Sequence, residues 1–206
     1  MKTWALLFVM ASAASPLAAQ ETFNGCPMEG NAKGAAARAL NLLKNRYAPP
    51  GEQDFDQTAT LGALVAPGDD RTRWNQVRAA TVVGYVRDVT PGGIESVNCR
   101  LRSLLDRDTH IEMVVDPASA SGPHRVVVEV TPRWRAIMAS RGVDWSTGAL
   151  RKNYLGRWVR VTGWLLFDSE HANAAENTAP GRPRNRRATA WEIHPVTSIE
   201  LAAPPR

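Results

Sequence analysis

The sequence predicts a mainly β domain with flanking helices, and three observations support this expectation. From residue 77 onward, apolar and polar residues alternate with the period of a β-strand. Five such runs occur, and a helical segment lies between the third and the fourth. Three strands, a helix and two further strands are the order of an OB-fold, which is a small Greek-key barrel. We therefore expect a five-stranded OB-fold-like barrel over residues 77–201, followed by a tail at 202–206.

The expected strands are separated by turns or by the helical segment. Gly84 is expected to mark a bend in the first strand. The helical segment combines "RWRAIMASR" with "STGALRKNYLG". The strand runs, in chain order, are ATVVGYVRDV, THIEMVVD, HRVVVEVT, RWVRVTGWLLF and ATAWEIHPVTSIEL.

An N-terminal helix and a connector are expected over residues 20–76, ahead of the barrel. The run "NAKGAAARALNLLKNRY" predicts a helix that Asn31 caps and Pro49-Pro50 ends. Its expected apolar stripe consists of Ala36, Ala39, Leu40 and Leu43. The connector that follows is polar and broken by Gly and Pro, and its expected anchors on the barrel are Leu61, Leu64 and Val65.

Residues 1–19 are typical of a secretory signal peptide. Lys2 precedes an apolar run from Trp4 to Ala14, and the small residues before Gln20 predict cleavage after Ala19. The run is too short to cross a bilayer, and no later segment is long and apolar enough to do so. We expect an exported protein, periplasmic or secreted.

Export determines how the two cysteines are interpreted. Cys26 and Cys99 are the only cysteines, and an oxidising compartment favours a disulfide between them. Closing a loop of this length stabilises the fold by about 4 kcal/mol in the chain-entropy model. We expect the bond to tie the N-terminal segment to the barrel.

Arginines are concentrated in the loops after the first and the fourth strand. The formal net charge is +5, and basic loops suit a polyanion, although they also keep an exported protein soluble. The loop arginines "PGRPRNRR" have few acids nearby, so we expect them to be exposed. Their joint replacement by Ser is then expected to leave the thermal midpoint nearly unchanged. These residues are Arg182, Arg184, Arg186 and Arg187, and the first loop carries Arg100 and Arg102.

The closing strand carries polar residues on one face. Trp191, Ile193, Ile199 and Leu201 share the parity expected for the core, while Glu192 and His194 share the other. Alternation likewise places His110 and Glu112 of the second strand outward, together with Arg125 and Glu129 of the third. Three interpretations of this outer face remain open.

The first interpretation is a metal site. His110, His171 and His194, with Glu112 and Glu192, are suitable ligand types. However, the third strand separates the second from the fifth, so their backbones are about 10 Å apart. No compact ligand spacing such as HExxH occurs.

The second interpretation is a ligand-binding face. OB-folds bind oligonucleotides and oligosaccharides across the second and third strands, between the loops after the first and fourth. Tyr85, Trp158 and Trp164 are candidate stacking residues. The candidate binding residues are Arg100, Arg102, Arg125, Arg182, Arg184, Arg186, Arg187, Glu112, Glu192 and His194. The third interpretation is structural: His194 bonds to a carboxylate or carbonyl, and Pro195 marks an edge or a bulge.

The segments "DTHIEMVVDP", "VRVTGWLLFDSEH" and "AWEIHPVTSIE" resemble uncharacterised exported bacterial proteins with an OB-fold-like barrel. The resemblance extends over roughly residues 77–200. It implies the fold and export, and it transfers no catalytic residue.

The sequence favours a non-catalytic exported module that binds single-stranded nucleic acid or another polyanion, such as an acidic oligosaccharide. It contains no GxSxG, P-loop or dinucleotide motif. No cofactor is expected, with a divalent metal as the alternative. Two other functions remain open: a metal-dependent phosphodiesterase or nuclease that uses the His/Glu cluster, and an adaptor that docks on an envelope protein.

Overall fold

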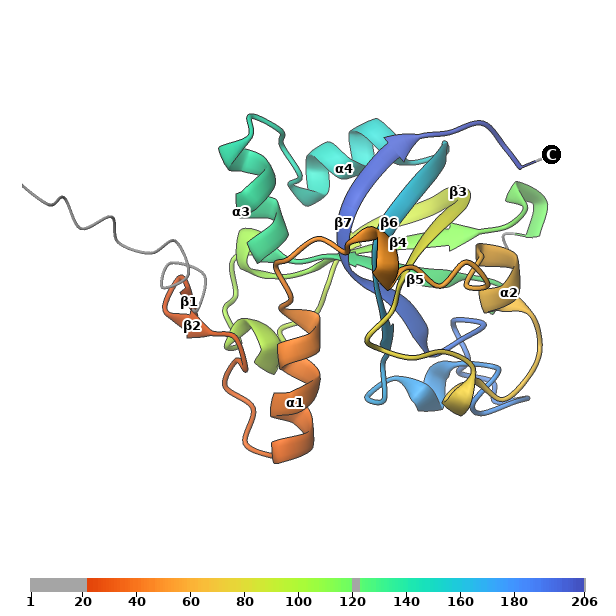
Figure 1. The fold of residues 1–206 in the computed structure, drawn as a ribbon, viewed down its shortest axis with the longest axis horizontal. Coiled ribbons are helices and arrows are strands. Elements are labelled where there is room, and N and C mark those ends of the chain that lie inside the picture. Colours follow the sequence, from red (N-terminus) through yellow and green to blue (C-terminus); the bar gives the residue numbers. More distant parts are fainter. Residues whose placement is uncertain (1–21, 120–122, 206) are drawn as a thin grey trace, which may run out of the picture.

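The computed structural model describes residues 22–119 and 123–205, which form a closed five-stranded barrel with helices around it (Figure 1). The order around the barrel is β3-β4-β5-β7-β6, and only β5 and β7 pair in parallel. This arrangement confirms the expected barrel with flanking helices. The expected signal peptide lies outside the described residues. The barrel strands are β3 (Ala79–Pro91), β4 (Thr109–Val114), β5 (Val126–Val130), β6 (Trp158–Phe167) and β7 (Trp191–Leu201).

The long strand β3 closes the barrel because it pairs with two neighbours. Its first half pairs with β6 and its second half with β4, and Tyr85 belongs to both registers. Gly84 lies at this change of partner. A Cβ atom there would lie 2.3 Å from Cδ2 of Leu61 and 3.0 Å from Cε of Met113. Glycine therefore allows the chain before the barrel to approach the strand closely.

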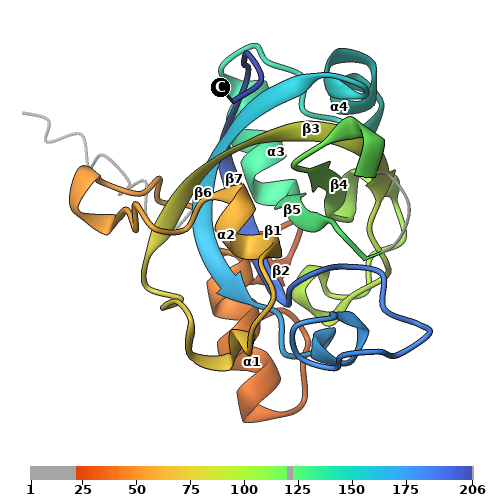
Figure 2. The same cartoon turned by 90° about the vertical axis from the view of Figure 1, so that its right-hand side faces the viewer.

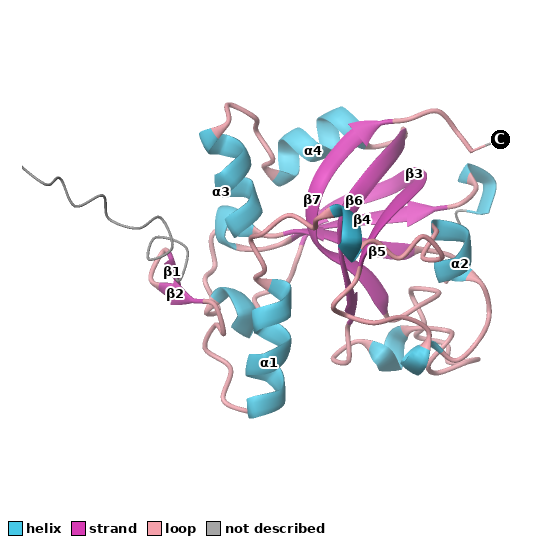
Figure 3. Ribbon diagram, viewed as in Figure 1, coloured by secondary structure: helices cyan, strands magenta, loops and turns pink. Residues whose placement is uncertain are grey.

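Helices α3 (Pro132–Ser140) and α4 (Thr147–Tyr154) lie between β5 and β6, where the sequence predicts them (Figure 3). The Thr131 side chain caps α3, and Pro132 occupies its first turn, where a missing N–H costs nothing. Trp134 of α3 and Leu150 of α4 are buried in the apolar core. The two helices thus contribute to the barrel interior rather than only covering it.

The segment before the barrel contains two short strands, β1 (Thr22–Phe23) and β2 (Cys26–Pro27), then α1 (Ala35–Lys44). Helix α1 begins after Gly34, not at Asn31, and its capping residue makes no side-chain bond. The predicted stripe is partly wrong, because Ala36 and Ala39 are not buried. The helix packs through Leu40 and two polar residues, Asn41 and Lys44. It lies against polar loop segments, which hydrogen-bond to these side chains.

The connector crosses the barrel as α2 (Leu61–Val65). Figure 2 shows α2 in front of the barrel. Leu61 and Leu64 are buried in the apolar core, and Val65 packs against it, so the predicted anchors are confirmed. None of the described helices has the length and apolarity needed to cross a bilayer.

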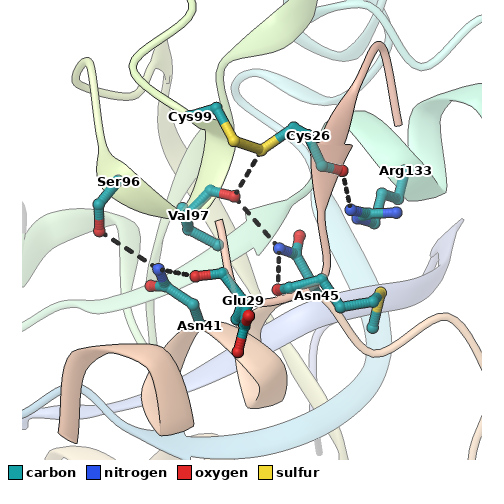
Figure 4. Close-up of a disulfide and its surroundings, with 9 residues drawn as sticks. Cys26, Glu29, Asn41, Asn45, Ser96, Val97, Cys99 and Arg133 are labelled. Atoms are coloured by element: carbon teal, nitrogen blue, oxygen red, sulfur yellow. Dashed lines mark hydrogen bonds between the residues drawn. A yellow bond between two sulfur atoms is a disulfide. The ribbon is translucent and has the colours of Figure 1, made fainter. Parts of the chain in front are cut away.

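A disulfide between Cys26 and Cys99 joins β2 to the loop after β3, as predicted (Figure 4). It links positions 73 residues apart. Beside it, the Asn45 amide donates to the carbonyl oxygens of Met28 and Val97 at 2.8 and 3.2 Å. The bond and this amide together hold β2, α1 and the loop after β3 in one unit.

The closing strand β7 departs from simple alternation. Trp191, Ile193 and Ile199 lie in the core as expected, but Leu201 is 53% exposed at the end of the strand. The register against β6 shifts on both sides of Gly163, so residues 194–195 and 197 have no partner on β6. As a result, Val196 enters the core although it has the opposite parity. A bulge at Pro195 agrees with the structural interpretation, and the His194–Pro195 peptide bond is cis.

Candidate functional site: a buried charged network beneath a basic pocket

Glu192 and His194 point away from the apolar core, yet both are fully buried. We expected an outward face and did not anticipate what covers it. Helix α1 packs against β7, and the segment between β6 and β7 supplies Arg187, which contacts Glu192. Over β5 and the first part of β7, the outer face of the barrel is therefore a second buried layer that is rich in charged side chains.

Glu129 is the centre of this layer. It is opposite His110 in the pairing of β4 with β5, and the parallel register of Val128 with Ile193 places it next to His194. Its Oε1 lies 3.2 Å from Nε2 of His110, and its Oε2 lies 3.3 Å from Nδ1 of His194. Strand β5, which is the third barrel strand in chain order, lies between β4 and β7 and so separates the two histidines, as the strand order predicts. The carboxylate of Glu129 on β5 contacts both of them.

Arg187 neutralises the carboxylates at one side of the layer. It pairs with Glu192 and lies 3.5 Å from Asp168, and only 8% of the residue is exposed. The expectation that all four loop arginines are exposed is therefore wrong for Arg187. For the same reason, replacement of all four arginines is now expected to destabilise the fold, because loss of Arg187 leaves two buried acids without their cation.

Lys44 of α1 neutralises the other side. Its Nζ lies 3.3 Å from Glu95 and 3.4 Å from Glu170. Burial opposes the lysine charge, but the surrounding carboxylates, Glu95 first, hold its pKa above the ordinary value. Burial also opposes ionisation of Glu95, and Lys44 holds the pKa of that carboxyl below its usual range. The pair is thus charged at neutral pH.

Three members of the layer have pKa values shifted toward the neutral form. Burial, with Glu95 nearby, raises the pKa of Asp108 to about 7. Burial and the charge of Glu192 raise the pKa of Glu129 well above its usual value. Burial and Lys44 hold the pKa of His194 well below that of a free imidazole. Burial is the largest cause of all three shifts, because removal from water disfavours the charged form of each group.

A pocket of about 500 Å³ opens above the layer. Its base is the outer face of β4 and β5, and its wall is the segment between β6 and β7, which is blue in Figure 1. His171 in this wall is about half-exposed, and its Nδ1 lies 2.5 Å from Oδ2 of the buried Asp168. That hydrogen bond raises the pKa of His171. The lining residues are Thr90, His110, Glu112, Val127, Glu170, His171, Asn173, Ala174, Arg184, Arg186 and Arg187.

The pocket has an excess of positive charge. Its two carboxylates already have cationic partners: Glu112 is 2.8 Å from Arg125, and Glu170 pairs with Lys44. Arg184 is exposed, and neither it nor Arg186 has an acidic partner among the residues described. Two free guanidinium groups therefore face a pocket whose acids are neutralised.

Other predicted binding residues lie elsewhere. Arg100 and Arg102 are exposed on the loop beside the disulfide and do not line the pocket. Arg182 is exposed, with Nη1 3.4 Å from Oδ1 of Asn173. The aromatic candidates lie on β3 and β6: Tyr85 packs edge-on against Trp158, and Trp164 lies under the Arg46 guanidinium.

His110, His171 and His194 do not form one ligand set. Within residues 22–119 and 123–205, one group of three potential ligands has atoms that all lie within 4.8 Å of one another. It consists of Asp108, Glu129 and His194. His110 contacts this group through Glu129, and His171 belongs to the Asp168 pair.

Sequence reasoning missed several members of the layer. Strand alternation places Glu129 correctly on the outer face. Pairing its strand with the two neighbouring strands would have identified it as the residue between His110 and His194. Asp108 comes directly before a strand, where acids are common turn residues. Asp168 belongs to the acid-rich loop "DSEHANAAEN", which suggests a cation or a catalytic acid but equally suits a turn. Lys44 and Glu95 carry no local signal, because only the tertiary packing of α1 against the loop after β3 brings them to the layer.

The chain has no significant match among protein-family models, curated proteins or solved structures. The resemblance to exported bacterial barrel proteins therefore stays a prediction.

Proposed function

We propose that this protein binds a polyanion, with single-stranded nucleic acid as the preferred class, in the pocket over β4 and β5. The observation that carries the proposal is the pair of arginines without acidic partners, Arg184 and Arg186, beside carboxylates that Arg125 and Lys44 already neutralise. Accessible cations without acidic partners add little to stability, but they bind phosphate groups well.

The pocket favours contacts to the phosphate backbone over contacts to bases. Its lining contains no Phe, Tyr or Trp, so the aromatic stacking that many single-strand binders use has no platform there. The position agrees with the face on which OB-folds bind oligomers. We therefore expect little sequence preference and a strong dependence on salt.

Two double variants of equal charge test the proposal. R184S/R186S removes two arginines from the pocket, whereas R100S/R102S removes two exposed arginines outside it. Binding of a fluorescent oligo-dT is measured by anisotropy across a salt series. We expect only the pocket variant to weaken binding, and its log–log salt slope to become shallower by about 1.4, because each backbone contact to a single strand contributes about 0.7.

Equal weakening by both double variants would show that net charge, not the pocket, attracts the oligomer. An acidic oligosaccharide forms a second arm of the titration. Tighter binding of the saccharide at the same salt would make an acidic oligosaccharide, and not single-stranded nucleic acid, the preferred ligand class. If neither ligand bound at low salt, the proposal would be refuted. The disulfide supports export, which would place the ligand outside the cytoplasm.

Phosphodiester hydrolysis is a second candidate, favoured by the His171–Asp168 pair. A half-exposed imidazole held by a buried carboxylate at a pocket wall is suited to donate a proton to a leaving oxygen. Cleavage of an end-labelled RNA or DNA strand tests this. We expect H171N to abolish cleavage while R184S/R186S lowers it through binding; uncleaved substrate with wild-type protein would eliminate the candidate. No described contact favours an envelope adaptor, which stays a prediction from the sequence.

A further inference from the structure

The buried layer contains three potential metal ligands that converge from different parts of the barrel. Asp108 lies directly before β4, Glu129 is on β5, and His194 is on β7. One ligand atom from each lies within 4.8 Å of the other two. The centre of an equilateral triangle of that size is about 2.8 Å from each corner, so a contraction of several tenths of an ångström reaches the distances of zinc ligands.

Two of the three candidate ligands have buried atoms without a hydrogen-bond partner, whereas both carboxylate oxygens of Glu129 already contact a histidine. Both carboxylate oxygens of Asp108 and Nε2 of His194 are buried and make no hydrogen bond of normal geometry within the described residues. Asp108 is 2% exposed and His194 is fully buried. Buried polar atoms in folded proteins almost always have a partner, and a bound cation would supply one to all three of these atoms at once.

The charges of the layer point to the same conclusion. Five buried or largely buried carboxylates interact there: Glu95, Asp108, Glu129, Asp168 and Glu192. Three cations oppose them, namely Lys44, Arg187 and, next to Asp108, Arg135. Full ionisation leaves five negative against three positive charges, a deficit of two. One divalent cation, or two protons, would remove it.

We infer that Asp108, Glu129 and His194 form a binding site for a divalent first-row transition metal of the zinc or manganese class. Two carboxylate oxygens with one imidazole nitrogen suit these ions. Calcium is disfavoured, because it needs six to eight oxygen ligands. The ligand set differs from the three histidines that the sequence suggests, since it takes only His194 from them.

Neighbouring groups hold the ligands in place. Nδ1 of His194 lies 3.4 Å from Oε2 of Glu192, which Arg187 holds from the other side. Metal-binding histidines commonly donate their second ring N–H to such a carboxylate. His110 contacts Glu129 and also lines the pocket. It is therefore the side chain that separates the metal site from the pocket, and its movement offers an entry path.

The inference does not depend on polyanion binding, because the metal can be measured without an anionic ligand. Protein purified without a histidine tag is stripped with a chelator and titrated with Zn²⁺ or Mn²⁺ by calorimetry, with elemental analysis after dialysis. We expect one ion per chain and a rise in Tm on loading. D108N should weaken binding at least about 100-fold, because it removes a charged ligand rather than a supporting group.

E112Q is the matched control. It removes a carboxylate from β4 that lies outside the ligand set, and it should bind metal as the wild type does. Equal affinity of D108N and wild type, or no stoichiometric binding of either ion, would overturn the inference and leave two protons as the balancing charges. Co²⁺ added to wild-type protein provides a readout that needs no variant: visible absorption bands of a four- or five-coordinate ion are expected, and their absence would count against the site.

Discussion

Strands β4, β5 and β7 each combine a buried apolar face with a buried or half-buried face that carries charged groups. The inner face presents Ile111, Val128 and Ile193, which are packed in the apolar core. The outer face, one residue along each strand, presents His110, Glu129 and His194. Burial alone therefore does not indicate what a face contributes to the protein.

The difference lies in how each face offsets the cost of leaving water. The inner face gains free energy for every apolar side chain buried. The outer face must offset the desolvation of each charge with a partner, and such ion pairs often give no net stabilisation. A buried charged layer that adds little stability is best explained by a function. Variants in this layer should change the free energy of unfolding differently at charges that have a partner and at charges that do not.

The largest effect is expected at the best-paired charge. Arg187→Met leaves Glu192 and Asp168 buried without their cation, and we expect the free energy of unfolding to fall by about 3–5 kcal/mol. This loss would match the truncation of a large residue on the inner face, such as Ile193→Ala, at about 2–5 kcal/mol. Urea unfolding followed by tryptophan fluorescence measures both.

Arg186→Met is the matched control, since it makes the same substitution one position away, at a more accessible residue without an acidic partner. We expect a change of less than about 0.5 kcal/mol. If Arg186 and Arg187 prove equally sensitive, the wall of the pocket is a structural unit as a whole, and the contrast between its two arginines disappears.

The opposite sign is expected at Asp108, where burial and Glu95 oppose the charge more than Lys44 and Arg135 favour it, so that the pKa is raised. The carboxylate makes no hydrogen bond of normal geometry within the described part of the chain, and burying a charge in this way is unfavourable. In chelator-treated protein, Asp108→Asn should leave stability unchanged or raise it by up to about 1 kcal/mol. A loss of about 2 kcal/mol or more in the same urea assay would show that Asp108 has a structural role in the metal-free protein.

The smallest effect is expected at His171. Its hydrogen bond to Asp168 raises its pKa in the folded state, so the stabilisation is complete below the unfolded pKa of about 6.5 and is lost as the pH rises through the folded value. His171 is about half-exposed, so the contribution should be about 0.5 kcal/mol or less. His171→Asn should therefore lower stability at about pH 5.5 and have no effect near pH 9; a constant difference at both would indicate a packing effect.

The inner face could be predicted from the sequence, and the content of the outer layer could not. Alternation assigns Ile111, Val128 and Ile193 to the core because each strand repeats every two residues. It also places Glu129 and His194 on one face, which is correct. It cannot show that Lys44 comes from a helix 85 residues before Glu129, because that proximity is created by packing and not by any local pattern.

The two arginines at the end of "PGRPRNRR" make the same point. Arg186 and Arg187 are adjacent and chemically identical in the sequence. The backbone of Arg187 forms a bridge with Ala175, and its side chain pairs with the buried Glu192. Composition predicts a basic loop, and only the folded structure shows which arginine remains available for a ligand.

The disulfide has a consequence for when the site becomes complete. The Cys26–Cys99 bond and the Asn45 amide hold α1 against the loop that carries Glu95, so they also hold Lys44 over the charged layer. A chain whose thiols are still reduced retains every residue of the barrel but loses the covalent constraint that keeps this lysine in place. Oxidation of the two thiols would thus add the covalent restraint that keeps Lys44 beside the carboxylates of the charged layer.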